Sequence, residues 1–202
     1  DPEPTATEMT LRTASGGDRF VELIARRIDI GGQAAGLSTC QDLSDMRHVQ
    51  TSLLNTSQVL NQILDGDPVA TFVIDREHRV THWNRACEQL TGRDFWSVQG
   101  LVEKGTVFYE AERPLLCDLI VDGADAQALH ALYGDRIKPS PLVGGAVEAE
   151  DFFPAFGAEG RWLYFTAAPL RDATGAVVGA IETLQDITLR RRAEEELTRH
   201  RK

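Results

Sequence analysis

Cysteine is scarce in this sequence, and its spacing excludes several kinds of site. Three cysteines occur among the 202 residues, Cys40, Cys87 and Cys117, far apart and odd in number. This pattern matches neither a disulfide framework nor the paired spacing of a zinc site or a c-type haem site. We therefore expect reduced thiols, a cytoplasmic location and no metal site.

Long apolar runs and catalytic motifs are missing as well. No run approaches the roughly 20 apolar residues of a membrane span, and no signal-peptide pattern is present. The sequence holds no phosphate-binding loop, nucleophile elbow or H-E-x-x-H pair. The five histidines are scattered, and none lies in the context of a kinase phospho-acceptor. We therefore expect a segment that is not an enzyme.

The balance of charge argues against nucleic acid as a partner. The formal net charge is −10, with 42% hydrophobic and 26% charged residues, as in one or two domains with a real core. The basic run 190–192 precedes the acidic run 194–196 at helical spacing, which predicts ion pairs along one helix. Glu148 and Glu150 share a strand face, where we expect them in solvent.

Residues 160–192 carry the clearest pattern of the chain. Two apolar runs, 162–170 and 176–184, are separated by a D-A-T-G break at 172–175. Their aromatic and β-branched residues predict a long antiparallel hairpin. Thr188 follows as a candidate N-cap, and the charged residues 189–197 favour a helix.

A set of short motifs follows in order along the chain. The segments are 61–75, 80–84 and 86–92 in the first half and 167–172, Gly175, Gly179 and 186–188 in the second. Together they resemble a PAS domain, the α/β sensor module of bacterial signalling proteins. The resemblance covers residues 53–192 and implies an α+β fold, a five-stranded antiparallel sheet with a helical flank. It also implies that the D-I-T sequence at 186–188 joins the last strand to an output helix.

Within this domain the first elements can be read from local signals. We expect a strand at 69–74, a turn at 75–78, a returning strand at 79–83, and a helix at 85–90. Asn84 is the expected helix cap and Gly92 its terminator. Trp83, at the strand end, is expected in the core.

The segment 100–145 is longer than in a minimal PAS domain. Helices are expected at 114–121 and at 125–133, the second ended by Gly134, and then a loop at 138–145. Residues 146–156 supply the next strand. This enlarged flank resembles an insert in some PAS domains of proteobacterial sensors.

The first 43 residues resemble the end of a second domain of the same kind. Strands are expected at 8–14, 19–30 and 34–43, and T-C-Q-D-L at 39–43 echoes T-L-Q-D-I at 183–187. We interpret them as the last three strands of a preceding PAS-like domain. Because three isolated strands leave an apolar face bare, they must pack on the second domain, pair with another copy or stay partly disordered. We favour a dimer.

A helix is expected from Ser44 to Leu64. Its apolar residues recur at spacings of three and four, although Gln50 and Ser57 fall on the same stripe. We expect a connector helix in a parallel homodimer; the alternative is a helix packed only on its own domain. The domain division is thus 1–43, connector helix 44–65, PAS domain 66–188 and output helix 189–202, in a piece of a longer protein.

Cofactors can be tested against the same sequence. The flavin-binding relatives carry a reactive cysteine motif that is absent here, and b-type haem would need an axial histidine, for which His130 is the candidate. An organic ligand is the other possibility, with Arg113 and His130 placed to bind a carboxylate; ordinary core packing is the alternative reading. The residues expected to line the cavity are Phe72, Cys87, Leu116, Ile120, Tyr133, Phe152 and Tyr164.

The resemblance implies a sensory and dimerisation module of a histidine kinase or diguanylate cyclase, with an output domain later in the chain. The relay to that domain would pass through Gln185, Asp186, Ile187 and Thr188. The alternatives are a ligand-free spacer that sets dimer geometry, a haem-binding sensor, and an enzyme.

Overall fold

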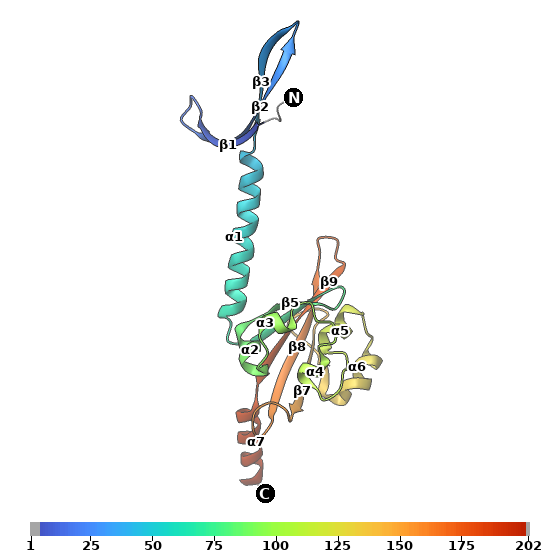
Figure 1. The fold of residues 1–202 in the computed structure, drawn as a ribbon. Helices are drawn as coiled ribbons and strands as arrows, with labels where there is room; N and C mark the ends of the chain where they lie inside the picture. Colours follow the sequence, from blue (N-terminus) through green and yellow to red (C-terminus); the bar gives the residue numbers. More distant parts are fainter. Residues whose placement is uncertain (1–4, 201–202) are drawn as a thin grey trace. The chain divides into compact units, whose positions relative to one another are not determined.

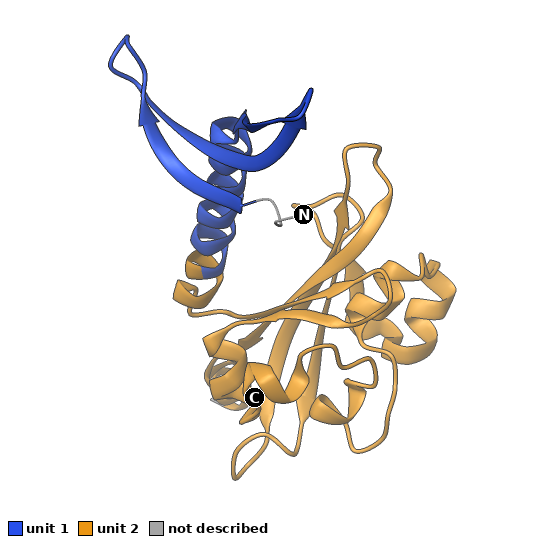
Figure 2. Cartoon of the chain, turned by 45° about the horizontal axis from the view of Figure 1, so that its top comes forward, with its two compact units in different colours: residues 1–61 blue, residues 62–202 orange. Residues whose placement is uncertain are grey.

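The chain folds into two compact units, divided between residues 61 and 62 (Figure 2). The structure is a computed structural model, and it describes residues 5–200. Helix α1 (Ser44–Gly66) runs across the division. No helix in the described range is both long and apolar enough to cross a membrane.

Unit 1 contains a three-stranded antiparallel sheet in chain order. Its strands are β1 (Thr5–Arg12), β2 (Asp18–Ile30) and β3 (Gln33–Asp42), close to the predicted ranges. Val21 is the only buried hydrophobic side chain among the described residues of this unit. The sheet therefore has almost no core of its own. Whether it descends from a PAS-like domain stays a prediction.

Helix α1 begins against the sheet of unit 1. The Ser44 hydroxyl accepts a hydrogen bond from the backbone amide of Phe20 at 2.9 Å, and the Arg47 guanidinium lies 3.5 Å from the centre of the Phe20 ring. Beyond this contact the apolar side chains of the helix are bare, with exposed fractions of 53–69%. They are Met46, Val49, Leu53, Leu54, Val59, Leu60 and Ile63.

Unit 2 is built on a six-stranded antiparallel sheet in the order β5-β4-β9-β8-β7-β6. Strands β5, β7, β8 and β9 of this sheet are labelled in Figure 1. Five strands were predicted. The sixth, β6, lies partly in the predicted loop because the buried Ile137 pairs with Ala149. The strands are β4 (Ala70–Asp75), β5 (Val80–Trp83), β6 (Ile137–Pro139), β7 (Val147–Phe153), β8 (Arg161–Arg171) and β9 (Val177–Asp186).

The helices of unit 2 lie between β5 and β6 in the chain, and a last helix follows β9. The predicted helices are present as α2, α5 and α6, whereas α3 and α4, of four residues each, were missed. The full set of helices is α2 (Arg85–Thr91), α3 (Phe95–Val98), α4 (Gly105–Phe108), α5 (Leu116–Val121), α6 (Ala126–Tyr133), the 3-10 turn η1 (Gly134–Arg136) and α7 (Thr188–His200).

Asn84 fixes the start of α2, as predicted. Its side-chain oxygen accepts from the backbone amides of Cys87 at 3.0 Å and of Thr71 at 2.9 Å, so the cap also ties α2 to β4. Gly92 ends the helix with a φ of 72°, a conformation that glycine adopts without strain.

One face of the sheet and the helical flank enclose the core. Alternate residues of β4, β8 and β9 point to this inner face, among them Phe72, Phe165 and Leu184. Phe72 lies 5.2 Å from Trp83 and 5.8 Å from Phe108 between ring centres. Aromatic packing thus joins β4 and β5 to the flank.

Candidate functional site

The predicted ligand-lining residues divide between the two faces of the sheet. Phe153 is 2% exposed, whereas Phe152, its neighbour on β7, is 40% exposed. Phe152 pairs with Trp162, and Tyr164 pairs with Glu150, so Phe152 and Tyr164 both point to the outer face. Their expected place over the inner face was wrong, because a shift of one residue reverses the face of a strand side chain. The others, Phe72, Cys87, Leu116, Ile120 and Tyr133, lie in or against the core.

Arg113 lies in an aromatic stack on the flank. Its guanidinium is 4.2 Å from the Tyr109 ring centre and 4.9 Å from that of Tyr133. Its Nε and Nη2 atoms are buried without a hydrogen-bond partner, and buried donors of this kind normally have one. His130 is exposed on α6, outside this stack. The structure therefore supports Arg113 as a candidate for binding an anionic group more than it supports His130.

A buried ion pair, which the sequence reading missed, lies beneath the flank. Lys104 is 1% exposed, and its Nζ lies 2.5 Å from Asp118 Oδ1. Nδ1 of His78 lies 2.8 Å from the same oxygen, and Asp118 Oδ2 accepts the backbone amide of Leu115 at 2.8 Å. Asp118 thus joins α5 to the β4–β5 turn and to the segment before α4.

A second buried carboxyl group lies in the middle of the sheet. Glu182, on β9, points inward between its cross-strand neighbours Phe72 and Ala167, and its Oε2 accepts the backbone amide of Cys117 at 2.8 Å. Burial raises the pKa of Glu182 to about 7, against the opposing effect of the hydrogen bonds from Cys117. Successive side chains of β9 alternate between the two faces of the sheet, and this alternation places Glu182 on the inner face. A glutamate would ordinarily be expected in solvent.

The predicted relay residues form a connected junction between β8, β9 and α7. Asp186 Oδ1 accepts the backbone amide of Thr188 at 2.9 Å, and the backbone amide of Ile187 donates to the carbonyl of Trp162 at 2.8 Å. The backbone amide of Trp162 donates to the Thr188 hydroxyl at 3.0 Å. Gln185 is exposed, opposite Tyr164.

Thr188 differs from its predicted role as N-cap. The carbonyl of Ile187 accepts the first helical hydrogen bond, from Arg191 at 2.9 Å, so Ile187 holds the cap position with its side chain buried. The Thr188 hydroxyl instead binds the neighbouring strand. The helix start is therefore fixed to β8 as well as to β9.

The arginines of α7 pair chiefly with carboxylates outside their own helix. Glu150, on β7, accepts from Arg190 at 2.7 Å and from Arg191, and Arg192 binds Glu159 at 2.5 Å. The predicted pairing along the helix is represented by Arg190 and Glu194 at 3.8 Å. Prediction from spacing alone could not include Glu150 on β7 or Glu159 in the turn before β8, which lie 33 to 41 positions away.

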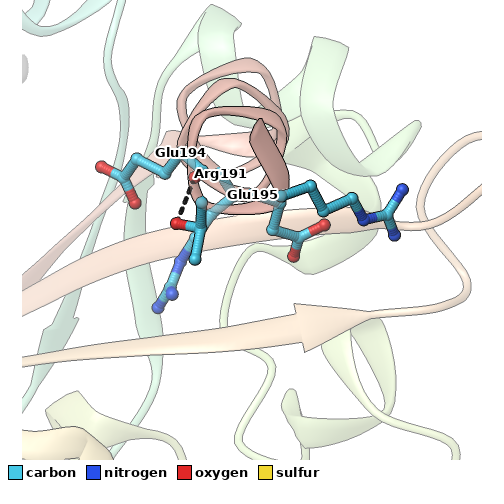
Figure 3. A pocket seen from close by; sticks show the side chains of 5 residues that line it. Arg191, Glu194 and Glu195 are labelled. Carbon is cyan, nitrogen blue, oxygen red and sulfur yellow. Dashed lines mark hydrogen bonds between the residues drawn. The ribbon is translucent and has the colours of Figure 1, made fainter. Parts of the chain in front are cut away.

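Two further contacts complete the surroundings of α7. The Arg191 guanidinium lies 4.8 Å from the Trp162 ring centre, which places a cation on the outer face of the sheet. Beside it, Arg191, Glu194 and Glu195 line a shallow pocket along the helix with Thr198 and Arg199 (Figure 3). The lining residues are all polar or charged and the pocket is open to solvent, whereas a small-molecule site is typically enclosed by hydrophobic side chains.

Glu148 does not lie in solvent as expected. It is 6% exposed on the outer face, and its Oε2 lies 3.6 Å from Lys138 Nζ. Hydrogen bonding with Ser140 lowers its pKa, and bonding with Tyr164 acts in the same direction. Glu150, two residues along the strand, is engaged by α7, so both carboxylates have structural partners.

Comparison with known proteins gives one family match and several structural likenesses. A family model described as PAS fold matches residues 142–192, and no curated protein sequence matches the chain. An RNA-binding light-oxygen-voltage receptor is 14% identical with a TM-score of 0.46, covering 98% of this chain and 82% of that one. The PAS domain of BvgS from Bordetella pertussis is 19% identical with a TM-score of 0.45, covering 74% and 98%. A sensory box sensor histidine kinase from Vibrio cholerae is 14% identical with a TM-score of 0.37, covering 69% and 97%.

The family match falls on the part of unit 2 where sequence motifs and geometry agree. Residues 142–192 include β7, β8, β9 and the first turn of α7. They contain the D-I-T motif at the junction that the hydrogen bonds define. Residues 142–192 of this chain therefore match the PAS fold.

Proposed function

We propose that the chain is a sensory and dimerisation module of a cytoplasmic signalling protein, a histidine kinase or a diguanylate cyclase. In this role a change in the core or the flank of the PAS domain moves β9, and residues 185–188 pass the movement to α7. The observation that carries the proposal is the double hydrogen bond between Trp162 and the start of α7, through Ile187 and Thr188.

The relay depends on the stiffness of this junction. Because β8 binds both the last residue before α7 and its first residue, the helix cannot turn freely at the end of the strand. A displacement of β9 relative to β8 therefore changes the direction of α7, which is a common way for a small shift to reach an output domain. Glu150 adds a second attachment one strand away, through Arg190 and Arg191.

Helix α1 supplies the surface proposed for dimerisation. One line of positions along this helix, called the seam below, recurs at alternating steps of three and four residues. This is the spacing of the contact positions in a two-stranded coiled coil. The apolar members of this seam are more than half exposed, so burying them against the same helix of a second copy is favourable. The seam consists of Met46, Val49, Leu53, Thr56, Leu60 and Ile63.

Charge substitutions on the seam test the dimer. We expect the chain to be a dimer by native mass spectrometry and light scattering, and the double variant L53E/L60E to be a monomer. Asn55→Glu with Gln58→Glu adds equal charge to exposed positions away from the seam and should leave the dimer intact. A monomeric wild-type chain would contradict the dimerisation part of the proposal.

Output activity tests the relay. In the full-length protein, Thr188→Val should change the basal output or its response to the signal, because the hydroxyl that binds β8 is lost. Thr198→Val is the matched control, since that hydroxyl bonds only within α7, to the carbonyl of Glu194. Equal output from the two variants would refute the relay.

A ligand-free spacer is the second candidate. The packed aromatic core favours it, since Tyr133 lies 5.8 Å from Phe165 and Phe153 lies 5.6 Å from Phe156 between ring centres. Two measurements on the purified chain separate the alternatives. In native mass spectrometry, a co-purifying organic anion supports sensing through Arg113, and in the absorbance spectrum a Soret band supports the haem variant. A chain that forms a dimer and carries no ligand supports the spacer.

A further inference from the structure

Glu182 occupies an unusual place for a carboxyl group. It lies at the centre of β9, on the inner face, and it is bonded to the first turn of α5 through the backbone amide of Cys117. Strand and flank are therefore held together at this point by a hydrogen bond to a titratable group. Six residues further along the chain, just past the end of β9, Thr188 begins α7.

Charged and titratable groups from several elements face Glu182. Asp118 on α5 and Lys104, before α4, are close enough to act on its pKa, in opposite directions. Burial raises the pKa of Cys87 on α2 and of Cys117 on α5, and the Glu182 charge acts in the same direction. It acts in the same direction on Tyr109 and on Tyr133, between which the Arg113 guanidinium lies. The partners of Glu182 on β4 and β8, Phe72 and Ala167, carry no charge.

Proton uptake changes what this side chain can bind. A carboxylate accepts hydrogen bonds only, and a bond to its charge is roughly twice as strong as one between neutral groups. The neutral acid keeps a weaker bond to the Cys117 amide and gains an O–H that needs an acceptor of its own. Asp118 is the nearby carboxylate on α5. Burial disfavours the charged form by more than these hydrogen bonds favour it, so the pKa of Glu182 is raised. Loss of the proton therefore loosens the contact between α5 and β9, because the carboxylate is more stable in water than in the core.

The geometry points to Glu182 as a proton-sensitive latch: its neutral form, buried between Phe72 and Ala167, keeps α5 on β9, and loss of the proton releases that hold. This inference rests on the proposed sensory function, because it names the proton as a signal that the PAS domain detects. It assigns a role to a side chain that neither the ligand prediction nor the junction uses. Burial, which raises the pKa of Glu182 to about 7, places the change in the physiological range.

Hydrogen exchange of the whole chain at pH 6 and pH 8, corrected for intrinsic rates, tests the latch. We expect amides 116–119 to exchange about tenfold faster at pH 8 than at pH 6, because opening this contact solvates Glu182 and is therefore favoured once the group is ionised. In Glu182→Gln this pH dependence should vanish. Glu77→Gln removes an exposed carboxylate from the β4–β5 turn of the same unit and should behave as wild type. Equal pH dependence in wild type and Glu182→Gln would overturn the inference.

Infrared spectroscopy of the wild type keeps the test open if Glu182→Gln does not fold. A protonated-carboxyl band that grows between pH 8 and pH 6, in step with the change at α5, supports the latch; no such band overturns it. The exchange of α7 is read in the same experiment. A response at α5 without one at α7 supports the latch and counts against the proposed relay, so the two failures are distinguishable.

Discussion

The backbone of Trp162 makes two hydrogen bonds to the start of α7: its amide donates to the Thr188 hydroxyl at 3.0 Å, and its carbonyl accepts from Ile187 at 2.8 Å. Strand pairing between β8 and β9 thus continues past the end of β9 into the first residue of the helix. A helix attached by one covalent link would turn freely at that link. This helix is held on two neighbouring strands, which makes its direction a property of the sheet.

Thr188→Val should loosen the first turn of α7. The substitution keeps the shape of the side chain and leaves the Trp162 amide without its acceptor, at a cost of about 1 kcal/mol. Local opening should become about fivefold more frequent, as measured by hydrogen exchange of amides 189–193. In Thr198→Val, which loses a hydroxyl on the same helix, those amides should exchange at the wild-type rate. Unchanged exchange in Thr188→Val would show that the bond to β8 does not hold the helix.

Glu150→Gln should weaken the attachment of α7 to β7. Both oxygens of this carboxylate accept from arginines, one from Arg190 and one from Arg191. Because the arginines are partly exposed, the loss should be about 0.5–1 kcal/mol and should shrink at high salt. Hydrogen exchange of the α7 amides at low and at high salt measures this loss of stability. Glu195→Gln, the same change within α7, should have a smaller effect; a larger one would refute the assignment.

The stability of unit 2 should fall as the pH rises from about 5 to 8. Burial raises the pKa of Glu182 from its ordinary 4.5 to about 7, so the folded chain holds this proton more tightly than the unfolded chain does. The resulting stabilisation is complete below pH 4.5 and is lost as the pH passes through 7. At most it amounts to about 3 kcal/mol. Chemical denaturation across this range should show the slope in wild type and a flatter curve in Glu182→Gln, and equal slopes would contradict the buried position.

Lys104→Met should destabilise unit 2 by about 3–5 kcal/mol, because the Asp118 carboxylate stays buried after its Lys104 partner has been removed. Lys138→Met removes a lysine that is largely exposed, so it should cost less than about 1 kcal/mol. Urea unfolding of Lys104→Met, Asp118→Asn and the double variant gives the coupling. The double variant should cost less than the sum of the two single changes. Additive costs would mean that the two charges do not interact.

Gly179→Ala should destabilise the pairing of β4 with β9. A methyl group at this position would lie 2.3 Å from the carbonyl oxygen of Ile74, so the strands must move apart. The expected cost is about 1–3 kcal/mol in thermal or urea unfolding. Gly144→Ala, at a position with open space, should be close to neutral. A neutral Gly179→Ala would show that the two strands pack less closely than the structure indicates.

Local signals in the sequence were enough for most elements of unit 2. Asn84 and Gly92 mark the ends of α2 by chemistry that a short window contains, and the D-A-T-G break marks the turn between β8 and β9. Helices α3 and α4 were missed because four residues carry no periodicity. Strand β6 was missed because its pairing with β7 is decided by a distant partner for Ile137.

The candidate site was harder to predict, since its members are set by register and by long-range contacts. Phe152 was placed on the wrong face because the ends of β7 were known to within a few residues only, and one residue decides the face. Glu182 was not proposed because a carboxyl group suggests solvent. Thr188 was correctly placed at the junction, but its partner, Trp162, lies 26 positions away. The residues near Thr188 in the sequence indicate neither how far along the chain this partner lies nor to which strand it belongs.

The distance between a spin label on α7 and one on β9 tests the central claim most directly. Leu197 and Val178 are exposed positions for the two labels, and Cys40 is an exposed cysteine that must be replaced by serine first. Measurement in a spin-diluted sample of the whole chain reports the distance within one copy. A rigid junction predicts a single narrow distance distribution, which broadens in Thr188→Val. A broad distribution in the wild type would mean that α7 moves independently of the sheet, and the proposed relay would be wrong.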